Sequence, residues 1–171
     1  MKNHHKFIQQ RGVTLIELLI VLTLLGILLG AASGSWRNLL DRSQLTAGSN
    51  QIIGLIQLAR SEAIGKAPAL ICASDSDCGS FAVASGLTAV LDINDNGRYD
   101  GGDIEIASVR FDADTRIRWR SFRNRPHLRL DVRGTVYHQN GHFMLCRGQQ
   151  GQKVVVSWLG KLRSERHAPD C

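Results

Sequence analysis

The stretch from Gly12 to Ala32 reads GVTLIELLIVLTLLGILLGAA and carries one charged residue, Glu17. At about 1.5 Å of rise per residue, a helix of this length spans the hydrocarbon core of a bilayer, which is about 30 Å thick. The sequence therefore predicts a membrane-spanning helix over residues 13–34. A carboxylate without a partner is costly to bury in such a helix, so we expect Glu17 to face a partner and to be functional.

The segment before this stretch, residues 1–12, is short, polar and basic, and it ends in Gly12 directly before the apolar run. An ordinary secretory signal has its small-residue cleavage site after the apolar core. Residues 31–33 (Ala-Ala-Ser) match such a site only weakly. The pattern favours a leader that is removed after Gly12, and a generic signal anchor is the alternative.

Residues Gly12, Val13, Thr14, Leu15, Ile16 and Glu17 resemble the processing site of the type IV prepilins. In that family a dedicated peptidase cuts between a glycine and an F-T-L-I-E-like segment, and Val13 stands where phenylalanine is commonest. The resemblance implies cleavage between Gly12 and Val13, methylation of the new N-terminus, and assembly through Glu17. The Glu17 carboxylate would neutralise the amine of a neighbouring subunit, an ion pair that is far stronger in lipid than in water.

The resemblance also implies where the protein is located and what it contacts. Because the positive leader stays in the cytoplasm, the chain is expected to cross the inner membrane once, with its head in the periplasm and later on a pilus at the cell surface. The implied partners are prepilin peptidase, membrane lipid before assembly, and other major and minor pilins.

Charge is distributed unevenly along the 171 residues, whose formal net charge is +6. Residues 110–171 hold 13 Lys and Arg against 5 Asp and Glu, whereas residues 13–109 hold 5 against 10. Such asymmetry between the halves suggests a polyanionic partner for the second half.

The four cysteines suit an oxidising compartment if they pair. Three pairings are possible, and we favour the local one, Cys72 with Cys78 and Cys146 with Cys171. A bridge between Cys146 and Cys171 closes a loop of about 25 residues, worth roughly 3 kcal/mol in the chain-entropy model. A zinc site is the alternative, but no C-x-x-C or spaced histidine pair supports it.

Beyond the membrane segment, apolar residues recur at helical spacing from Trp36 to Ala63, and Gly65 and Pro68 are stop signals. Residues 35–66 are therefore predicted to be an amphipathic second half of the same helix. Residues 67–171 contain short apolar runs separated by Gly, Asn and Asp, which predict a β-rich head of antiparallel sheets with a basic C-terminal tail. The fold class is α+β, with the head packed on the long N-terminal helix.

Two of these runs, TRIRWRS (115–121) and LRLDVR (128–133), alternate apolar with charged residues, which predicts strands with one buried face and one charged face. In the first run the charged residues are Arg116, Arg118 and Arg120. The last run, KVVVSWLGKLR (153–163), is expected to form one strand.

One loop has the register of an EF-hand calcium site. Oxygen side chains stand at its positions 1, 3, 5, 9 and 12, with a glycine at position 6. They are Asp92, Asn94, Asn96, Asp100 and Asp103. The loop lies between two expected strands, and its Asn-Gly and Asp-Gly-Gly are also strong hairpin signals. We therefore predict no metal or other cofactor and keep calcium as the alternative.

The C-terminal run VVVSWLGKLRSERH narrows the resemblance to the H-type minor pseudopilins (GspH) and the FimT/FimU-like minor pilins. FimT-like proteins of naturally transformable bacteria carry a G-R-x-R tail implicated in binding DNA, and here the matching residues are Gly160, Lys161, Leu162 and Arg163. Lysine keeps the positive charge but lacks the bidentate fork of arginine. We call Lys161, Arg163 and Arg166 the basic tail.

The resemblance, together with these charges, implies a minor pilin whose basic tail binds DNA phosphates during transformation, assisted by Arg116, Arg118 and Arg120. The simpler interpretation of these charges is a solvated face that protects an edge strand from aggregation. Trp119 and Trp158 are candidates for base stacking, although an aromatic within a strand is more often core. The alternative function is structural: a minor pilin or pseudopilin that primes filament assembly without binding DNA.

No enzymatic motif is present. The mature histidines, His127, His138, His142 and His167, are scattered, without an HExxH, a nucleophile elbow or a phosphate loop. We expect no catalytic residues and no enzymatic activity.

Overall fold

The computed structural model describes residues 12–81, 83–136, 139–167 and 171, with the backbone alone for residues 31–35 and 167. Most of the expected leader, residues 1–11, lies outside this range, as does His138. The chain divides into two compact units, Met1–Leu39 and Leu40–Cys171.

One helix, α1 (Leu15–Ala63), contains residues of both units, and each of its ends has a sequence signal. At its start, the hydroxyl of Thr14 accepts a hydrogen bond from the N–H of Glu17 (3.4 Å). A Thr-x-x-Glu spacing is typical of a capping box, and an acid in the first turn is favoured by the helix dipole. At the other end, Gly65 takes a φ of 71° and donates its N–H to the carbonyl of Val132 (3.1 Å). A left-handed glycine of this kind ends many helices, as the sequence predicted.

In the first unit, the large apolar side chains from Val13 to Leu29 are 48–83% exposed. Among the residues that the structure describes, no helix combines the length and the hydropathy needed to cross a membrane. The membrane span over residues 13–34 is not confirmed and stays a prediction.

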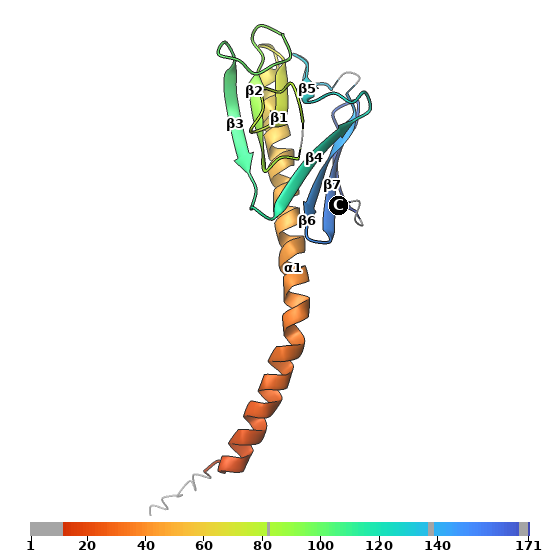
Figure 1. Ribbon diagram of the computed structural model, residues 1–171. Coiled ribbons are helices and arrows are strands. Elements are labelled where there is room, and N and C mark those ends of the chain that lie inside the picture. Colours follow the sequence, from red (N-terminus) through yellow and green to blue (C-terminus); the bar gives the residue numbers. More distant parts are fainter. Residues whose placement is uncertain (1–11, 82, 137–138, 168–170) are drawn as a thin grey trace, which may run out of the picture. The chain divides into compact units, whose positions relative to one another are not determined.

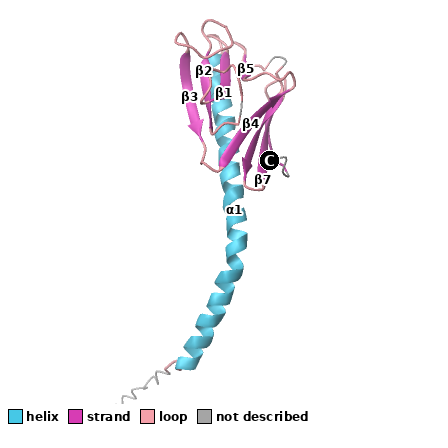
Figure 2. Cartoon of the chain, in the orientation of Figure 1, coloured by secondary structure: helices cyan, strands magenta, loops and turns pink. Residues whose placement is uncertain are grey.

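The second unit contains two four-stranded antiparallel sheets (Figures 1 and 2). Sheet A has the order β3-β2-β1-β5, and its strands are β1 (Ala69–Ala73), β2 (Gly86–Leu91), β3 (Ile104–Arg110) and β5 (Leu128–Leu130). Sheet B has the order β4-β6-β7-β8, and its strands are β4 (Thr115–Ser121), β6 (Gly141–Arg147), β7 (Gln150–Val156) and β8 (Leu162–His167). An isolated bridge between Ala84 and Ile117 connects the segment before β2 to β4.

The main core lies between α1 and the inner faces of the two sheets. From α1 it takes Leu45, Ile52, Leu55, Ile56, Ala59 and Ala63, all nearly fully buried. The sequence placed the start of the apolar stripe earlier, but Trp36, Leu39 and Leu40 are 50–63% exposed. The predicted α+β class with antiparallel sheets on the helix is confirmed.

The strands of the two sheets differ in how many faces they bury. β4 alternates between buried and more exposed residues, as its sequence predicted, and β5 does the same. β1 and β2 are buried at every residue. Their second face forms a small cluster of Leu70, Cys72, Cys78 and Val90, against which Tyr99 packs. The loops that carry Cys78 and Tyr99 thus cover this face, which removes the need for polar residues on it.

The C-terminal run is a hairpin, not the single strand that the sequence suggested. β7 ends at Val156 and β8 begins at Leu162, antiparallel to it. What the sequence presented as a tail is therefore, from Leu162 to His167, an edge strand of sheet B.

Candidate nucleic-acid interface

Three arginines of β4 lie on the face of sheet B that points away from the core. Arg116 and Arg120 are exposed and Arg118 is half-buried, while the alternate residues Thr115, Ile117 and Trp119 are buried. Within the described residues, none of the three arginines forms an ion pair. The arginine pattern that the sequence singled out thus leaves three side-chain charges without a counterion in the described part of the chain.

The strand register adds two more cations to this face. Arg120 pairs with His142, His142 with Val155, and Val155 with Arg163. In the next outward-facing row, Arg118 pairs with Met144, and Met144 pairs with Lys153. Because directly paired residues project to the same side of a sheet, these side chains share one surface.

We call the outward-facing Arg116, Arg118, Arg120, Lys153 and Arg163 the basic face. At about 4.8 Å between neighbouring strands, its two edges, β4 and β8, are about 14 Å apart. Sequence reasoning missed Lys153. The alternation of half-buried Lys153 and Val155 with buried Val154 and Val156 is the signal that could have identified it.

Among the described side chains of this surface, one is acidic. Glu165 of β8 is paired by register with Lys153 and forms an ion pair with Arg163. Exposed pairs of this kind contribute little to stability, so the pair can open when a stronger anion arrives. Arg163 is 68% exposed at its side chain and remains accessible.

Lys161 lies in the turn that joins β7 to β8. Its N–H donates to the hydroxyl of Ser157 (3.0 Å), and its carbonyl accepts from the N–H of Ser157 (3.0 Å). Gly160 takes a φ of 77°, and its carbonyl accepts a hydrogen bond from Arg60 of α1. The turn is therefore fixed to the helix, with the exposed Lys161 beside the basic face.

Arg166, the third residue of the basic tail, lies on the opposite face. It pairs by register with Gln152, which is 9% exposed and points toward α1. It lines a groove together with Arg42 of the helix. The structure thus brings Arg163 together with the β4 arginines and separates Arg166 from them.

The two tryptophans have different environments. Trp119 is buried against Phe143, with ring centroids 4.5 Å apart, and its Nε1 donates to the carbonyl of Arg125 (3.1 Å). It is a core residue and is not placed to stack on a base. Trp158, in the β7–β8 turn, is 57% exposed.

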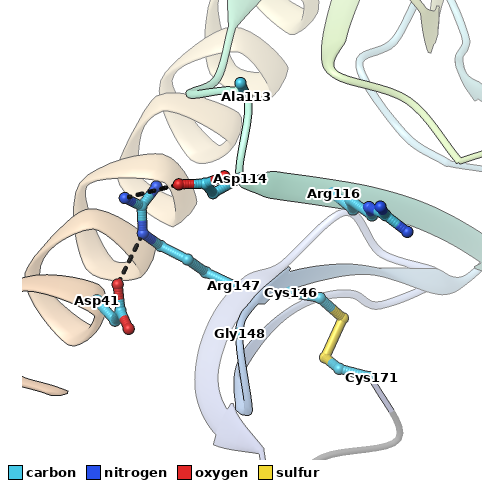
Figure 3. A pocket seen from close by; sticks show the side chains of 8 residues that line it. All are labelled: Asp41, Ala113, Asp114, Arg116, Cys146, Arg147, Gly148 and Cys171. Carbon is cyan, nitrogen blue, oxygen red and sulfur yellow. Dashed lines mark hydrogen bonds and ion pairs between the residues drawn. A yellow bond between two sulfur atoms is a disulfide. The ribbon is translucent and has the colours of Figure 1, made fainter. Parts of the chain in front are cut away.

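A cavity of about 460 Å³ lies beside the basic face (Figure 3). Arg147 of β6, which lines the cavity, contacts Asp41 of α1 (2.8 Å), Asp112 (3.2 Å) and Asp114 (3.8 Å). The hydrogen bond with Asp41 raises the pKa of Arg147. Because its charge is matched by carboxylates, Arg147 connects helix and sheet and is not available to a phosphate. Arg116 points away from this cluster.

Both pairs of cysteines form the disulfides that the sequence favoured. Cys72 is bonded to Cys78, and Cys146 of β6 is bonded to Cys171 (Cα–Cα 5.6 Å; Figure 3). The second bond attaches the C-terminus to the outer side of sheet B beside Arg116.

In the candidate calcium loop, the carboxylate oxygens accept hydrogen bonds from other groups of the same loop. The Asp92 carboxylate accepts from the N–H groups of Asn96 (3.0 Å) and Gly97 (2.8 Å). Asp103 accepts from Ile93 and Asp100, and Asp100 accepts from the amides of Asn94 and Asn96. A hydrogen bond from the Gly102 N–H, with those two amides, lowers the pKa of Asp100. In the described ranges, no group of three or more acids, histidines or cysteines is arranged for a metal.

The proposed processing site lies in the first unit. Gly12, Val13 and Glu17 are all exposed there. The contact between Thr14 and Glu17 gives the glutamate a local capping role that the sequence analysis did not include.

Comparison with known proteins adds family evidence to this geometry. The family model described as type II transport protein GspH matches residues 48–160. The chain belongs to the GspH family. A second model, the prokaryotic N-terminal methylation motif, matches residues 8–33. No match was found among curated proteins.

One solved structure is similar to this GspH-family chain. It is the type IV minor pilin FimU of Pseudomonas aeruginosa strain PAO1, with a TM-score of 0.51 and 23% identity. The match covers 76% of this chain and 96% of the FimU chain, and it shows that the fold is shared.

Membership of the GspH family makes the chain a type IV minor pilin or pseudopilin of the GspH, FimT and FimU type. Such proteins are structural subunits that associate with other pilins. The methylation motif is typical of membrane-anchored pilus components that a prepilin peptidase processes.

Proposed function

We propose that this protein is a minor pilin that binds extracellular DNA without sequence specificity during uptake for natural transformation. The observation that supports this most strongly is the basic face, because it unites arginines from β4 with Lys153 and Arg163 on one exposed surface of sheet B. Lys161 adds a cation at the adjoining turn.

The chemistry of this surface suits phosphates better than bases. Arginines projecting from a strand contact backbone oxygens through charge-assisted hydrogen bonds, which carry no sequence information. A surface about 14 Å wide, whose described side chains include a single carboxylate, gives several such contacts at once. Binding is therefore expected to weaken steeply with salt, because the release of DNA counterions gains less free energy as the bulk salt concentration rises.

The test measures binding of a labelled oligonucleotide to the full-length chain in a nonionic detergent, across a salt series. An Arg116, Arg118, Arg120 to Gln variant and a Lys161, Arg163 to Gln variant are compared with the wild type. Each lost phosphate contact is expected to reduce the slope of log K against log salt by about 0.7 to 0.9.

The matched control is Arg98→Gln, because Arg98 is exposed in the loop after β2 and forms its ion pair with Asp77. It removes one cation elsewhere on the head and should leave the slope near that of the wild type. If the basic-face variants bind DNA as the wild type does, the proposal is wrong. In cells, glutamate at the same positions should abolish DNA uptake while pili still form.

A structural role is the second candidate, and the exposed apolar start of α1 favours it. We infer that residues 13–34 enter the inner membrane, that the leader is removed between Gly12 and Val13, and that Glu17 pairs with the amine of a neighbouring subunit. Apolar side chains that are 48–83% exposed need lipid or another helix to cover them. If Glu17→Gln blocks assembly while the basic-face variants behave as wild type in every assay, this role is the better account.

A further inference from the structure

The groove that receives Arg166 is a separate feature from the basic face. One wall is formed by Arg42, Leu45 and Thr46 of α1, and the other by Gln150 and Gln152 of β7 and Arg166 of β8. Its volume is about 280 Å³. Two arginines thus line a small groove, and no acidic residue is among the described residues that line it.

The hydrogen bonds in this groove orient one arginine and leave its charge unmatched. Arg42 donates from Nε to Oε1 of Gln150 (3.3 Å). The side-chain amide of Gln152 is hydrogen-bonded within the protein at both ends, since its Nε2 donates to Ser164 (2.8 Å) and its Oε1 accepts from Thr46 (3.4 Å). In the part of the chain that the structure describes, neither Arg42 nor Arg166 forms an ion pair.

An oxyanion fits this arrangement better than other ligands. Two guanidinium groups on opposite walls repel each other unless an anion lies between them. The planar fork of arginine matches the paired oxygens of a phosphate, and the bonds are charge-assisted. The groove is too small for an extended apolar ligand, and Leu45, its one large apolar side chain, is buried.

We propose that the groove between Arg42 and Arg166 binds a phosphate group, and that in the proposed function this is a phosphate of the DNA backbone. The inference rests on that function for the identity of the ligand. Register places Arg163 on the outer face of β8 and Arg166 on its inner face. A DNA strand that follows the edge of sheet B therefore meets cations on both sides of β8, and the edge strand is the element around which it bends.

The experiment has two arms, both on the full-length chain in nonionic detergent. In the first, inorganic phosphate is titrated while the backbone amides of Gly151 and Gln152 are followed by NMR. We expect saturable shifts in the wild type and their loss in Arg42→Gln and Arg166→Gln. Shifts that are absent, or that persist in both variants, overturn the site.

In the second arm, an oligonucleotide is bound across a salt series. Each single variant should weaken binding several-fold, because one of the two guanidinium groups that hold the phosphate is lost. The double variant should weaken it further and lower the salt slope by about 0.7 to 0.9 in total, as expected for the loss of one phosphate contact, because both arginines hold the same phosphate. Arg98→Gln is the control for loss of one charge, and Arg42→Lys with Arg166→Lys should keep part of the binding.

The outcomes separate this inference from the proposed function. If DNA binds and the groove variants match Arg98→Gln, the groove inference is wrong and the DNA-binding proposal stands. If the wild type binds no DNA, the DNA-binding proposal fails and a backbone phosphate is ruled out as the ligand. The phosphate titration then decides whether the groove is an anion site at all.

Discussion

Gly160 shows how a single residue fixes the position of the basic tail. Its φ of 77° lies in the left-handed region, and a Cβ there would lie 2.6 Å from Nη2 of Arg60. We predict that Gly160→Ala lowers the free energy of unfolding by about 1 to 2 kcal/mol, since this conformation is unfavourable for alanine. Urea unfolding measures the effect.

The matched control is Gly101→Ala, because a Cβ at Gly101 meets no atom within 4 Å. That variant should unfold within about 0.5 kcal/mol of the wild type, as surface substitutions usually do. Equal stability of the two alanine variants would contradict the strain assigned to Gly160.

His127 makes stability depend on pH. Burial lowers its pKa, partly opposed by the hydrogen bond between Nδ1 and the carbonyl of Cys78 (2.9 Å), and Arg129 and Arg125 lower it further. The unfolded chain therefore binds this proton more tightly than the folded protein. Stability from this residue is present above the ordinary histidine pKa of about 6.5 and is lost as the pH falls toward the folded-state value.

The measurement is the urea midpoint at pH 7.5 and pH 5.5. We expect the midpoint to drop over this interval in the wild type and to drop less in His127→Gln. Asp100, whose pKa is lowered by hydrogen bonds, contributes stability that is present above about pH 4 and is lost only below it, so this contribution does not change between pH 7.5 and pH 5.5. A fall of the same size in both proteins would show that another group titrates.

The sequence identifies single residues better than it identifies which of them meet. The alternation in TRIRWRS is enough to assign Arg116, Arg118 and Arg120 to an exposed face, because a strand has a side-chain period of two. Arg163 and Arg166 are three residues apart, so they lie on opposite faces of any strand that contains both; which of them faces outward depends on the register of β8, and a shift by one residue would exchange them. Arg42 becomes relevant only through the packing of α1 on β7, which no local pattern contains.

At the scale of elements, β8 depends on the second disulfide. Among the strands that the structure describes, it pairs only with β7, and the bond between Cys146 and Cys171 fastens the chain four residues beyond its end to β6. We predict that Cys146→Ser with Cys171→Ser costs roughly 3 kcal/mol, from the chain-entropy model. Hydrogen exchange should show the β8 amides losing protection first.

The internal reference for that experiment is β1, which is buried along its whole length in sheet A. Its amides should lose only the protection that the change in global stability removes. If β8 exchanges no faster than β1 in the double serine variant, the disulfide does not hold this edge strand.

Element boundaries mark where prediction from sequence was weakest. The end of α1 was predictable because Gly65 is a local stop signal. The β7–β8 turn was missed because its residues, SWLGK, are themselves partly apolar and basic, so the run looks continuous in the sequence. Gly160 is nevertheless the kind of residue that such a turn requires. The burial of β1 and β2 on both faces depends on distant loops, so their sequence shows only apolar runs.

At the scale of the whole molecule, the core and the apolar N-terminal segment are assigned to different units. Every residue of the main core cluster lies between Leu45 and Val156, and both disulfides lie within residues 40–171. By contrast, the apolar side chains from Val13 to Leu29 are exposed. We therefore predict that a chain consisting of residues 40–171 folds cooperatively and stays monomeric without detergent, whereas the full-length chain needs detergent to avoid association.

Circular dichroism with thermal unfolding tests whether the shorter chain folds cooperatively, and size-exclusion chromatography with light scattering tests the association of both chains. The control is the full-length chain with Leu18, Leu22 and Leu25 changed to Ser, which should need less detergent while melting at the same temperature as the shorter chain. A shorter chain that aggregates or melts without cooperativity would show that residues before Leu40 belong to the folding unit.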